Sequence, residues 1–146
     1  MILDIYNNIK TLIADTLSSD HKELSHVFDI AQNKFQGSSK GYGLLPNSAN
    51  EIAGETQANT MSQGFKIILT DSYISNNLSD AELTTKTLQM IEATETIFKE
   101  LVLKKCGSPA MIQNVLNFAV ESAVIAKEDK VILVEATFDV RIKISF

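Results

Sequence analysis

The sequence predicts one α+β domain over residues 1–146, in which a mainly antiparallel sheet with a long C-terminal β-hairpin packs against an N-terminal helix and a long central helix. The stretch 131–146 carries apolar residues at every second position, which is the spacing of a strand with one buried face. The stretches 2–17 and 80–105 carry apolar residues at three- and four-residue steps, the spacing of amphipathic helices. A chain of 146 residues that is 45% apolar is long enough to bury one core.

The remaining elements follow from shorter patterns. The first helix ends at the polar residues that begin with Ser18, and imperfect alternation then predicts a strand within 25–35. A second strand is predicted at 65–69. The long helix is expected to start after Ser79, because Glu82 lies three residues later and the two can form a capping box. It ends where two lysines are closely followed by a glycine and a proline.

The last two strands are predicted to pair with each other. Apolar residues occupy even positions in 116–126, as they do in 131–146. The even-numbered side chains of the two strands can share one face only if even-numbered residues lie opposite even-numbered ones. This requires either that Lys127 lies opposite Val131 across a three-residue loop, or that a bulge shifts the register by one residue. About thirteen paired residues would span about 43 Å, whereas a globule of this chain length is about 30 to 35 Å across. Part of the hairpin should therefore bend, bulge or project, and self-assembly would protect a projecting ribbon.

The stretch 36–64 is predicted to be one long loop, or a loose excursion that contains a short hairpin. It holds all but one of the six glycines, together with many serines and asparagines, and loops of this length are usually functional or disordered. Its apolar residues are spaced too irregularly for a core face, yet the stretch is too apolar for a pure linker. We therefore expect them to contact a partner chain. These residues are Tyr42, Leu44, Leu45 and Ile52.

No pattern of catalytic residues is present, so we expect neither an enzyme nor a bound metal or cofactor. His21 and His26 lack the spacing of metal ligands. The glycines around Lys40 lack the Walker spacing of a phosphate-binding loop. Cys106 is the only cysteine, which excludes an intramolecular disulfide and suggests a structural thiol. The apolar N-terminus is interrupted by Asp4 and has no basic segment, so we expect neither a signal peptide nor a membrane span.

The charged residues suggest a surface that does not bind nucleic acid specifically. The net charge is −5 and the pI is about 5.0, whereas nucleic-acid readers normally carry a basic face. Arg141, the only arginine, and Lys143 lie on the polar side of the last strand. Both residues can be explained as a solvated face. The functional interpretation is an ion pair across a subunit boundary, because a guanidinium group favours partly buried pairs.

Taken in order, the chain consists of an amphipathic helix, a strand, a long polar loop, a strand, a helix and a terminal hairpin that closes on VEATFDVRIKISF. In this order and length it resembles the small tail-terminator and neck proteins of long-tailed bacteriophages. The resemblance implies a structural virion protein that is assembled in the host cytoplasm. It further implies a hexameric ring that caps the tail tube, stops its polymerisation and joins it to the head connector, and it implies no catalytic residues.

The implied partners are other copies of the chain, the tail tube protein and the head-tail connector proteins. DNA would pass through the lumen of the ring without specific binding. An acidic subunit that is repeated around a ring suits this role, because its lining would not hold phosphate groups. Two alternatives stay open. One is a head-completion or connector-side adaptor, and the other is a small ligand-binding α+β domain, which would need a concave pocket with convergent polar groups.

Overall fold

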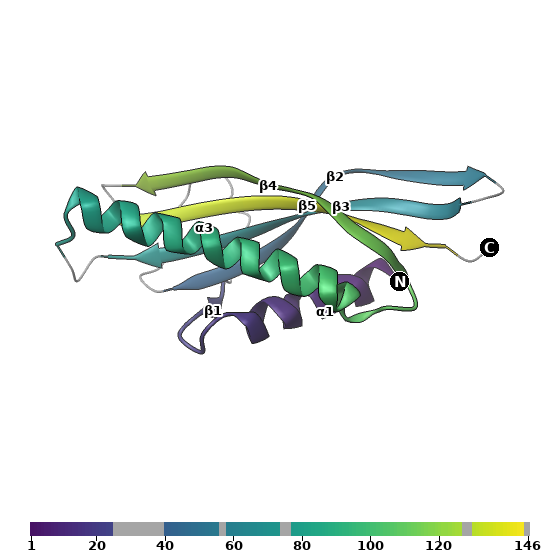
Figure 1. Cartoon of the computed structure of the whole chain (residues 1–146), viewed down its shortest axis with the longest axis horizontal. Helices are drawn as coiled ribbons and strands as arrows, with labels where there is room; N and C mark the ends of the chain where they lie inside the picture. Colours follow the sequence, from purple (N-terminus) through teal and green to yellow (C-terminus); the bar gives the residue numbers. More distant parts are fainter. Residues whose placement is uncertain (25–39, 56–57, 74–76, 127–129, 145–146) are drawn as a thin grey trace.

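The structure, a computed structural model, describes residues 1–24, 40–55, 58–73, 77–126 and 130–144. In this part of the chain, two α-helices lie on one face of a five-stranded, mostly antiparallel sheet (Figure 1). The predicted α+β class, N-terminal helix, long central helix and C-terminal hairpin are therefore confirmed. The strand predicted at 25–35 and the start of the predicted loop, 36–39, lie outside the described residues.

The sheet consists of two long hairpins that are joined side by side. In chain order, the elements are α1 (Ile2–Thr16), β1 (Lys22–Glu23), β2 (Gly41–Glu55), β3 (Ala58–Ser72), α3 (Asp80–Leu103), the 3-10 turn η1 (Lys105–Gly107), β4 (Ile112–Ala126) and β5 (Val131–Lys143). The strand order across the sheet is β1-β2-β3-β5-β4. The short strand β1 pairs parallel to β2, and all other neighbours are antiparallel. Strands β3 and β5 are therefore central, and α3 connects the two hairpins.

Both helices bury one stripe of side chains against the sheet. In α1 the stripe is Ile5, Ile9 and Ile13, which are completely buried at the four-residue spacing of one helix face. Helix α3 begins at the predicted capping box. The N–H of Glu82 donates to Ser79 Oγ, and the N–H of Ser79 donates to Glu82 Oε1, both at 3.3 Å. These bonds satisfy two amide groups that a helix start leaves unpaired, so the predicted start is confirmed.

The end of α3 is a left-handed turn. Lys105, Cys106 and Gly107 all have positive φ angles, of 46°, 53° and 71°. The turn reverses the chain and places Cys106 in the core beside α1, where Asn8 Nδ2 donates to Ser108 Oγ at 2.7 Å. A left-handed conformation costs a residue with a Cβ atom about 1 to 2 kcal/mol, so the tertiary contacts hold this turn against a local preference.

We expect Lys105→Gly to stabilise the protein by about 0.5 to 1 kcal/mol, because glycine removes the left-handed penalty but adds freedom to the unfolded chain. Urea unfolding followed by far-UV circular dichroism measures this change. Lys104→Gly is the matched control, since Lys104 has a φ of −94° and its replacement by glycine should destabilise. Equal effects of the two substitutions would contradict a penalty specific to the left-handed position.

Strand β5 has the alternation that its sequence predicts. From Glu135 to Lys143, even positions are buried and the positions between them are half-buried or exposed. On the helix side, the Phe138 ring stacks on the Phe65 ring at 5.7 Å between centroids. The start of the strand, 131–134, is buried on both faces, because a second apolar cluster covers the face opposite the helices. Its members are Leu24, Leu45, Ile68 and Leu133.

The register of the β4–β5 hairpin follows the second of the two predicted solutions. Ala126 lies opposite Val131, so the predicted three-residue loop is wrong. Strand β4 shifts its register in three places, and the first shift from the turn brings Val120 opposite Ala136, both at even positions. The first bulge therefore absorbs the offset, but the second brings Leu116 opposite Asp139 and reverses it, and the even faces coincide again only where Ile112 lies opposite Ile142. The bulges also bend the strand.

The described part of 36–64 is mainly a strand pair, so the predicted long loop is wrong. The alternative, an excursion that contains a short hairpin, was right about the hairpin and wrong about its length. Strands β2 and β3 pair from Gly41 opposite Thr70 to Glu55 opposite Ala58, with one irregularity. Their glycines, serines and asparagines have a low strand propensity, which is why their composition indicates a loop. The pairing of β3 with β5 along 60–72 outweighs this local preference. A Cβ atom at Gly41 would lie 2.4 Å from Leu24 Cδ2 and 2.9 Å from Thr70 Oγ1, so a larger residue there would force these side chains to move.

The far end of the β2–β3 hairpin extends beyond both helices, and the end of β5 runs beside it (Figure 1). In this region Thr60 lies opposite Lys143, and Ser62 lies opposite Arg141. The prediction that a long hairpin must bend, bulge or project is confirmed for β4, which bulges. The hairpin that reaches furthest past the helices, however, is β2–β3.

Candidate functional site

Three of the residues predicted to contact a partner are core residues. Tyr42, Leu44 and Leu45 are only 9%, 2% and 6% exposed. Tyr42 and Leu44 pack under the helices, where the Tyr6 hydroxyl donates to the Leu44 carbonyl at 2.9 Å. Leu45 points to the other face of the sheet and packs in the second cluster. The irregular spacing arises because both faces of β2 are covered here, so the prediction that these side chains are free for a partner is wrong.

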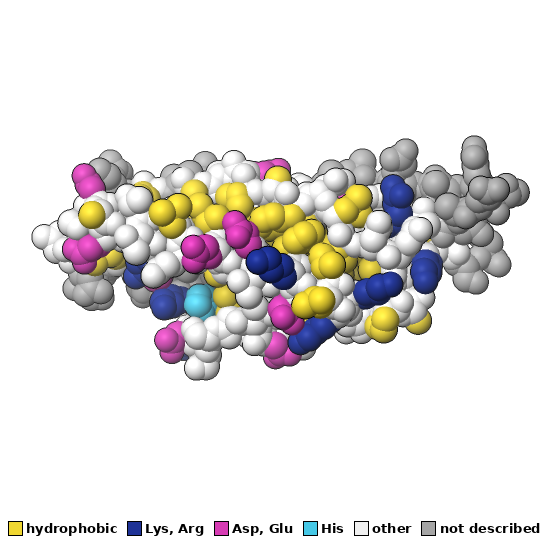
Figure 2. Space-filling view, in the orientation of Figure 1, with side chains coloured by type: hydrophobic (Ala, Val, Ile, Leu, Met, Phe, Trp, Pro, Cys, Tyr) yellow, Lys and Arg dark blue, Asp and Glu magenta, His cyan; other side chains and the backbone are white. Residues whose placement is uncertain are grey.

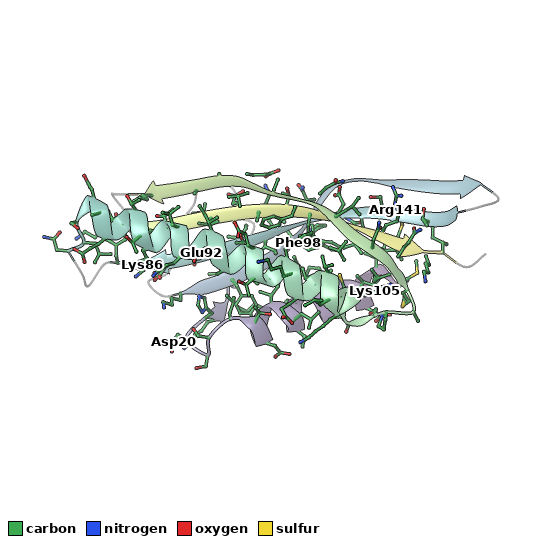
Figure 3. The ribbon with its side chains drawn as sticks, in the orientation of Figure 1. Asp20, Lys86, Glu92, Phe98, Lys105 and Arg141 are labelled. Carbon is green, nitrogen blue, oxygen red and sulfur yellow. The ribbon has the colours of Figure 1, made fainter. Side chains whose placement is uncertain are left out.

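The other three predicted contact residues lie on the projecting part of the sheet. Ile52 in β2 is opposite Met61, and its contact with a partner stays a prediction. Arg141 and Lys143 are exposed, and within the described ranges neither makes an ion pair with another side chain. Figure 3 shows Arg141 on the half of the molecule towards which the β2–β3 hairpin projects. The proposed ion pair across a subunit boundary stays a prediction too.

A network of charged side chains crosses the sheet on the face opposite the helices. Lys66 Nζ lies 3.2 Å from Glu121 Oε2 and 3.1 Å from Glu135 Oε2. Burial alone would lower the pKa of Lys66, but its hydrogen bonds to Glu135 and Glu121 outweigh this effect and the pKa is raised. The three groups come from different strands, so sequence spacing gave no signal for them. Because the charges pair internally, the network stabilises the sheet and offers no free catalytic group.

Lys66→Met should destabilise the protein by about 1 to 2 kcal/mol at pH 7, since it leaves two neighbouring carboxylates without their cation. Lys99→Met is the control, because Lys99 is exposed and should change the free energy of unfolding by less than about 0.5 kcal/mol. Urea unfolding of both variants measures the difference. A Lys66→Met protein as stable as the control would show that the network contributes nothing.

The same network predicts a pH dependence. The folded pKa of Lys66 is raised, so its stabilisation is complete below the unfolded pKa of about 10.4 and is lost as the pH rises through the folded pKa. Lys66→Met lacks this titrating group, so its stability deficit relative to the wild type should shrink as the pH rises above about 10.4. A deficit that stays the same above this pH would contradict an electrostatic origin.

A small polar pocket lies where α3 faces the end of β3. It has a volume of about 160 Å³ and is lined by His21, Lys40, Thr70, Asp71, Lys86 and Gln89, among others. Lys86 Nζ lies 3.3 Å from Asp71 Oδ2, and His21 Nδ1 lies 3.0 Å from Ser18 Oγ. This volume is below the roughly 300 to 1,000 Å³ of typical ligand sites. Lys40, Lys86 and Gln89 also line an adjoining, more open depression of about 490 Å³, so the pocket by itself fits a small molecule.

An apolar groove of about 440 Å³ lies between the start of α1 and the β2–β3 hairpin. Its walls are Ile2, Leu3, Tyr6, Pro46, Gln63 and Phe65. The polar groups of this wall are already used, since the Tyr6 hydroxyl and Gln63 Nε2 both donate to backbone carbonyls. Leu3 is 69% exposed at the rim. The groove therefore offers an apolar contact surface. Leu3 is the residue that could have indicated it from the sequence, because it is apolar but lies outside the buried stripe of α1.

Cys106 is a structural thiol in the described core. It is completely buried, and burial raises its pKa to about 12. At pH 8 only about 10⁻⁴ of the thiol would be ionised, against about a quarter of an ordinary cysteine. We expect iodoacetamide to modify the native protein about 1,000-fold more slowly than the urea-unfolded chain, as measured by mass spectrometry. Equal rates would contradict the burial.

The described ranges contain no group of three His, Cys, Asp or Glu side chains arranged to hold a metal ion; His26 lies outside them. Neither α1 nor α3 includes a segment that is both long and apolar enough for a bilayer. No protein-family model matches the chain, and a comparison with curated proteins found no match. The surfaces described above, and chiefly the projecting hairpin and the apolar groove, are therefore the basis for a functional proposal.

Proposed function

We propose that the chain is the subunit of a structural ring in the neck of a long-tailed bacteriophage. In this proposal it is a tail terminator, in which six copies cap the tail tube, stop its polymerisation and join it to the head connector. The observation that carries the proposal is the β2–β3 hairpin, which extends with the end of β5 beyond both helices (Figure 1). Neither of the two described helices, α1 and α3, covers these strand ends (Figure 1), and an assembly would be a simple way to cover them.

The edges of the sheet support a closed assembly and not an open fibre. Among the described strands, β4 forms one edge, and β2 forms the other beyond Gly41 and Tyr42, the two residues that pair with β1. Long bare edges favour pairing with other chains. Here β4 is interrupted by bulges and β2 contains Pro46 and a shift of register. These features hinder continuous strand addition, so we expect copies to associate through side-chain surfaces.

We assign the projecting part of the β2–β3 hairpin to the contact with the tail tube. Each subunit has a net charge of −5, and we expect aspartates and glutamates to line the lumen through which DNA passes without specific binding. The proposal gives no residue a catalytic role. A lumen lined mainly by lysines would contradict the part of the proposal that concerns DNA.

The first test is the mass of the purified protein in solution. Light scattering should find a ring of six copies of the 16.1 kDa chain, alone or on addition of the tail tube protein. The second test is capture by immobilised tail tube protein and, separately, by the head connector protein. Capture by both supports a tail terminator, and capture by the connector alone supports the head-completion or adaptor alternative. A monomer that neither protein captures would contradict both.

The small polar pocket favours a second candidate, a ligand-binding domain. Two lysines, a histidine and a glutamine surround it with one carboxylate, and this arrangement suits a small anion. Thermal unfolding in 10 mM inorganic phosphate, against equal ionic strength of chloride, tests this candidate. The ligand-binding domain would be favoured over the ring if the wild-type protein is a monomer whose melting temperature rises with phosphate, and if the melting temperature of Lys86→Met does not rise.

A further inference from the structure

A cluster of basic side chains lies at the end of the molecule towards which the β2–β3 hairpin projects. We call this cluster the basic end and define it by Lys105 of η1 and by Arg141 and Lys143 of β5, all of which are exposed. Figure 3 places Lys105 and Arg141 at this end. Among the described side chains in Figure 2, the charged groups visible at this end are all dark blue, whereas the magenta carboxylates lie over the rest of this face.

Backbone hydrogen bonds bring the two parts of the basic end together. The N–H of Lys143 donates to the Met111 carbonyl at 2.7 Å, and the N–H of Met111 donates to the Ser108 carbonyl at 3.0 Å. The end of β5 is therefore tied to the turn that follows η1. Arg141 and Lys143 lie on either side of the buried Ile142, so their side chains share one face of β5, about 7 Å apart along the strand.

The carboxylates beside the basic end are already engaged. Asp139, which precedes Arg141 on the same face of β5, accepts a hydrogen bond from Asn117 Nδ2 at 2.8 Å. Glu100 of α3 pairs with Lys104 at 3.2 Å. Within the described ranges, none of the three cations of the basic end forms an ion pair with a side chain. The basic end is therefore a local positive surface on a chain whose net charge is −5.

The row of residues that crosses the sheet at Arg141 adds polar groups to this surface. Ser62 of β3 lies opposite Arg141 on one side, and Asn114 of β4 lies opposite it on the other. Glu51 of β2 continues the row beyond Ser62, so its backbone is two strands from that of Arg141, about 10 Å away. A guanidinium group between a hydroxyl and an amide suits a carboxylate, which it binds through two parallel hydrogen bonds.

We propose that the basic end binds an acidic surface of the tail tube protein. This inference rests on the proposed function, because it names the chemistry of the partner that the projecting hairpin meets. The net charge of −5 opposes the approach of DNA, whose phosphates are densely spaced. The large apolar side chains that are exposed in the described ranges include no aromatic ring on which bases could stack. A few carboxylates on a protein surface match the basic end better.

The test compares charge reversals in the full-length protein. Arg141→Glu reverses one charge of the basic end, and Lys22→Glu makes the same change at an exposed position of β1, away from the projecting hairpin (Figure 1). In cosedimentation with tail tubes, Arg141→Glu should weaken binding at least about tenfold, because attraction becomes repulsion. Lys22→Glu should weaken it less than about threefold. Arg141→Lys keeps the charge and should bind more tightly than Arg141→Glu.

Salt provides a second measurement on the same samples. Raising NaCl from about 50 to about 300 mM should weaken wild-type binding more steeply than the binding of Arg141→Glu, because salt screens exposed charges. If Arg141→Glu binds tubes as tightly as Lys22→Glu, the inference is overturned and the proposed function stands. Duplex DNA that the wild type binds at about 150 mM NaCl, and Arg141→Glu does not bind, would also overturn it, since the basic end would then hold phosphates. A wild type that binds no tail tubes at either salt concentration would overturn both the inference and the proposed function.

Discussion

Phe138→Asp should leave the chain unfolded at 25 °C. Phe138 is 1% exposed and stacks on Phe65 at the centre of the helix-covered face. Losing the ring costs about 3 to 5 kcal/mol, and an unpaired carboxylate in the same place costs several kcal/mol more. The sum approaches or exceeds the total stability of about 5 to 15 kcal/mol that is usual for a domain. Val140→Asp should have the same effect, because Val140 is completely buried on the same face.

Urea unfolding followed by far-UV circular dichroism measures this result. Circular dichroism is a suitable probe because the chain has no tryptophan. Thr137→Asp is the matched control. It adds the same charge one residue away, on the opposite face of β5 and across from Lys66, so it should change the stability by less than about 1 kcal/mol. A Phe138→Asp protein that unfolds as cooperatively and at the same urea concentration as the control would show that the core is not organised around this face.

The elements that the sequence predicted correctly are those whose pattern is local. The stripe of α1, the capping box of Ser79 and Glu82, and the alternation of β5 each lie within a few residues of one another. Their side chains meet the core as the helix or strand period requires. In β5 the core face could therefore be identified position by position before the partner strands were known.

Only residues 65–69 of the β2–β3 hairpin were predicted as a strand in this way, because neighbouring strands decide the structure of the rest. Its composition indicates a loop, but β3 lies between β2 and β5 and has a partner on each side. Burial there depends on tertiary contacts, as for Leu45, which packs on the face that a half-buried strand would expose. Strand propensity is outweighed by such contacts more readily than helix propensity.

The candidate surfaces were hidden from the sequence for a related reason. The groove joins Ile2 and Leu3 to Pro46 and Phe65, and no spacing rule connects these positions. The predicted contact residues Tyr42 and Leu44 are in the core, while the exposed apolar side chains are spread over α1 and α3. Only the pairing of the strands brings these parts together, so the interface had to be found in the structure.

Trimming the projecting hairpin should separate the fold from the function. In this variant an Asn-Gly turn replaces 53–60, so that Ile52 and Met61, which are already paired, flank a two-residue turn of the type that hairpins prefer. The core residues of β2 and β3 remain. In β5, only Lys143 loses its paired residue, which is Thr60. We expect the stability to change by less than about 2 kcal/mol, since a shorter connection costs little.

The trimmed protein keeps both helices and the part of the sheet that they cover, so it should still form rings, but these rings should no longer bind the tail tube. Cosedimentation with tail tubes measures binding, and slow iodoacetamide modification of the buried Cys106 shows that the fold is intact. We expect a loss of at least about tenfold in binding, equivalent to about 1.4 kcal/mol. If trimmed rings bind and cap the tubes as the wild type does, the projecting hairpin is dispensable, and the observation that carries the proposed function no longer supports it.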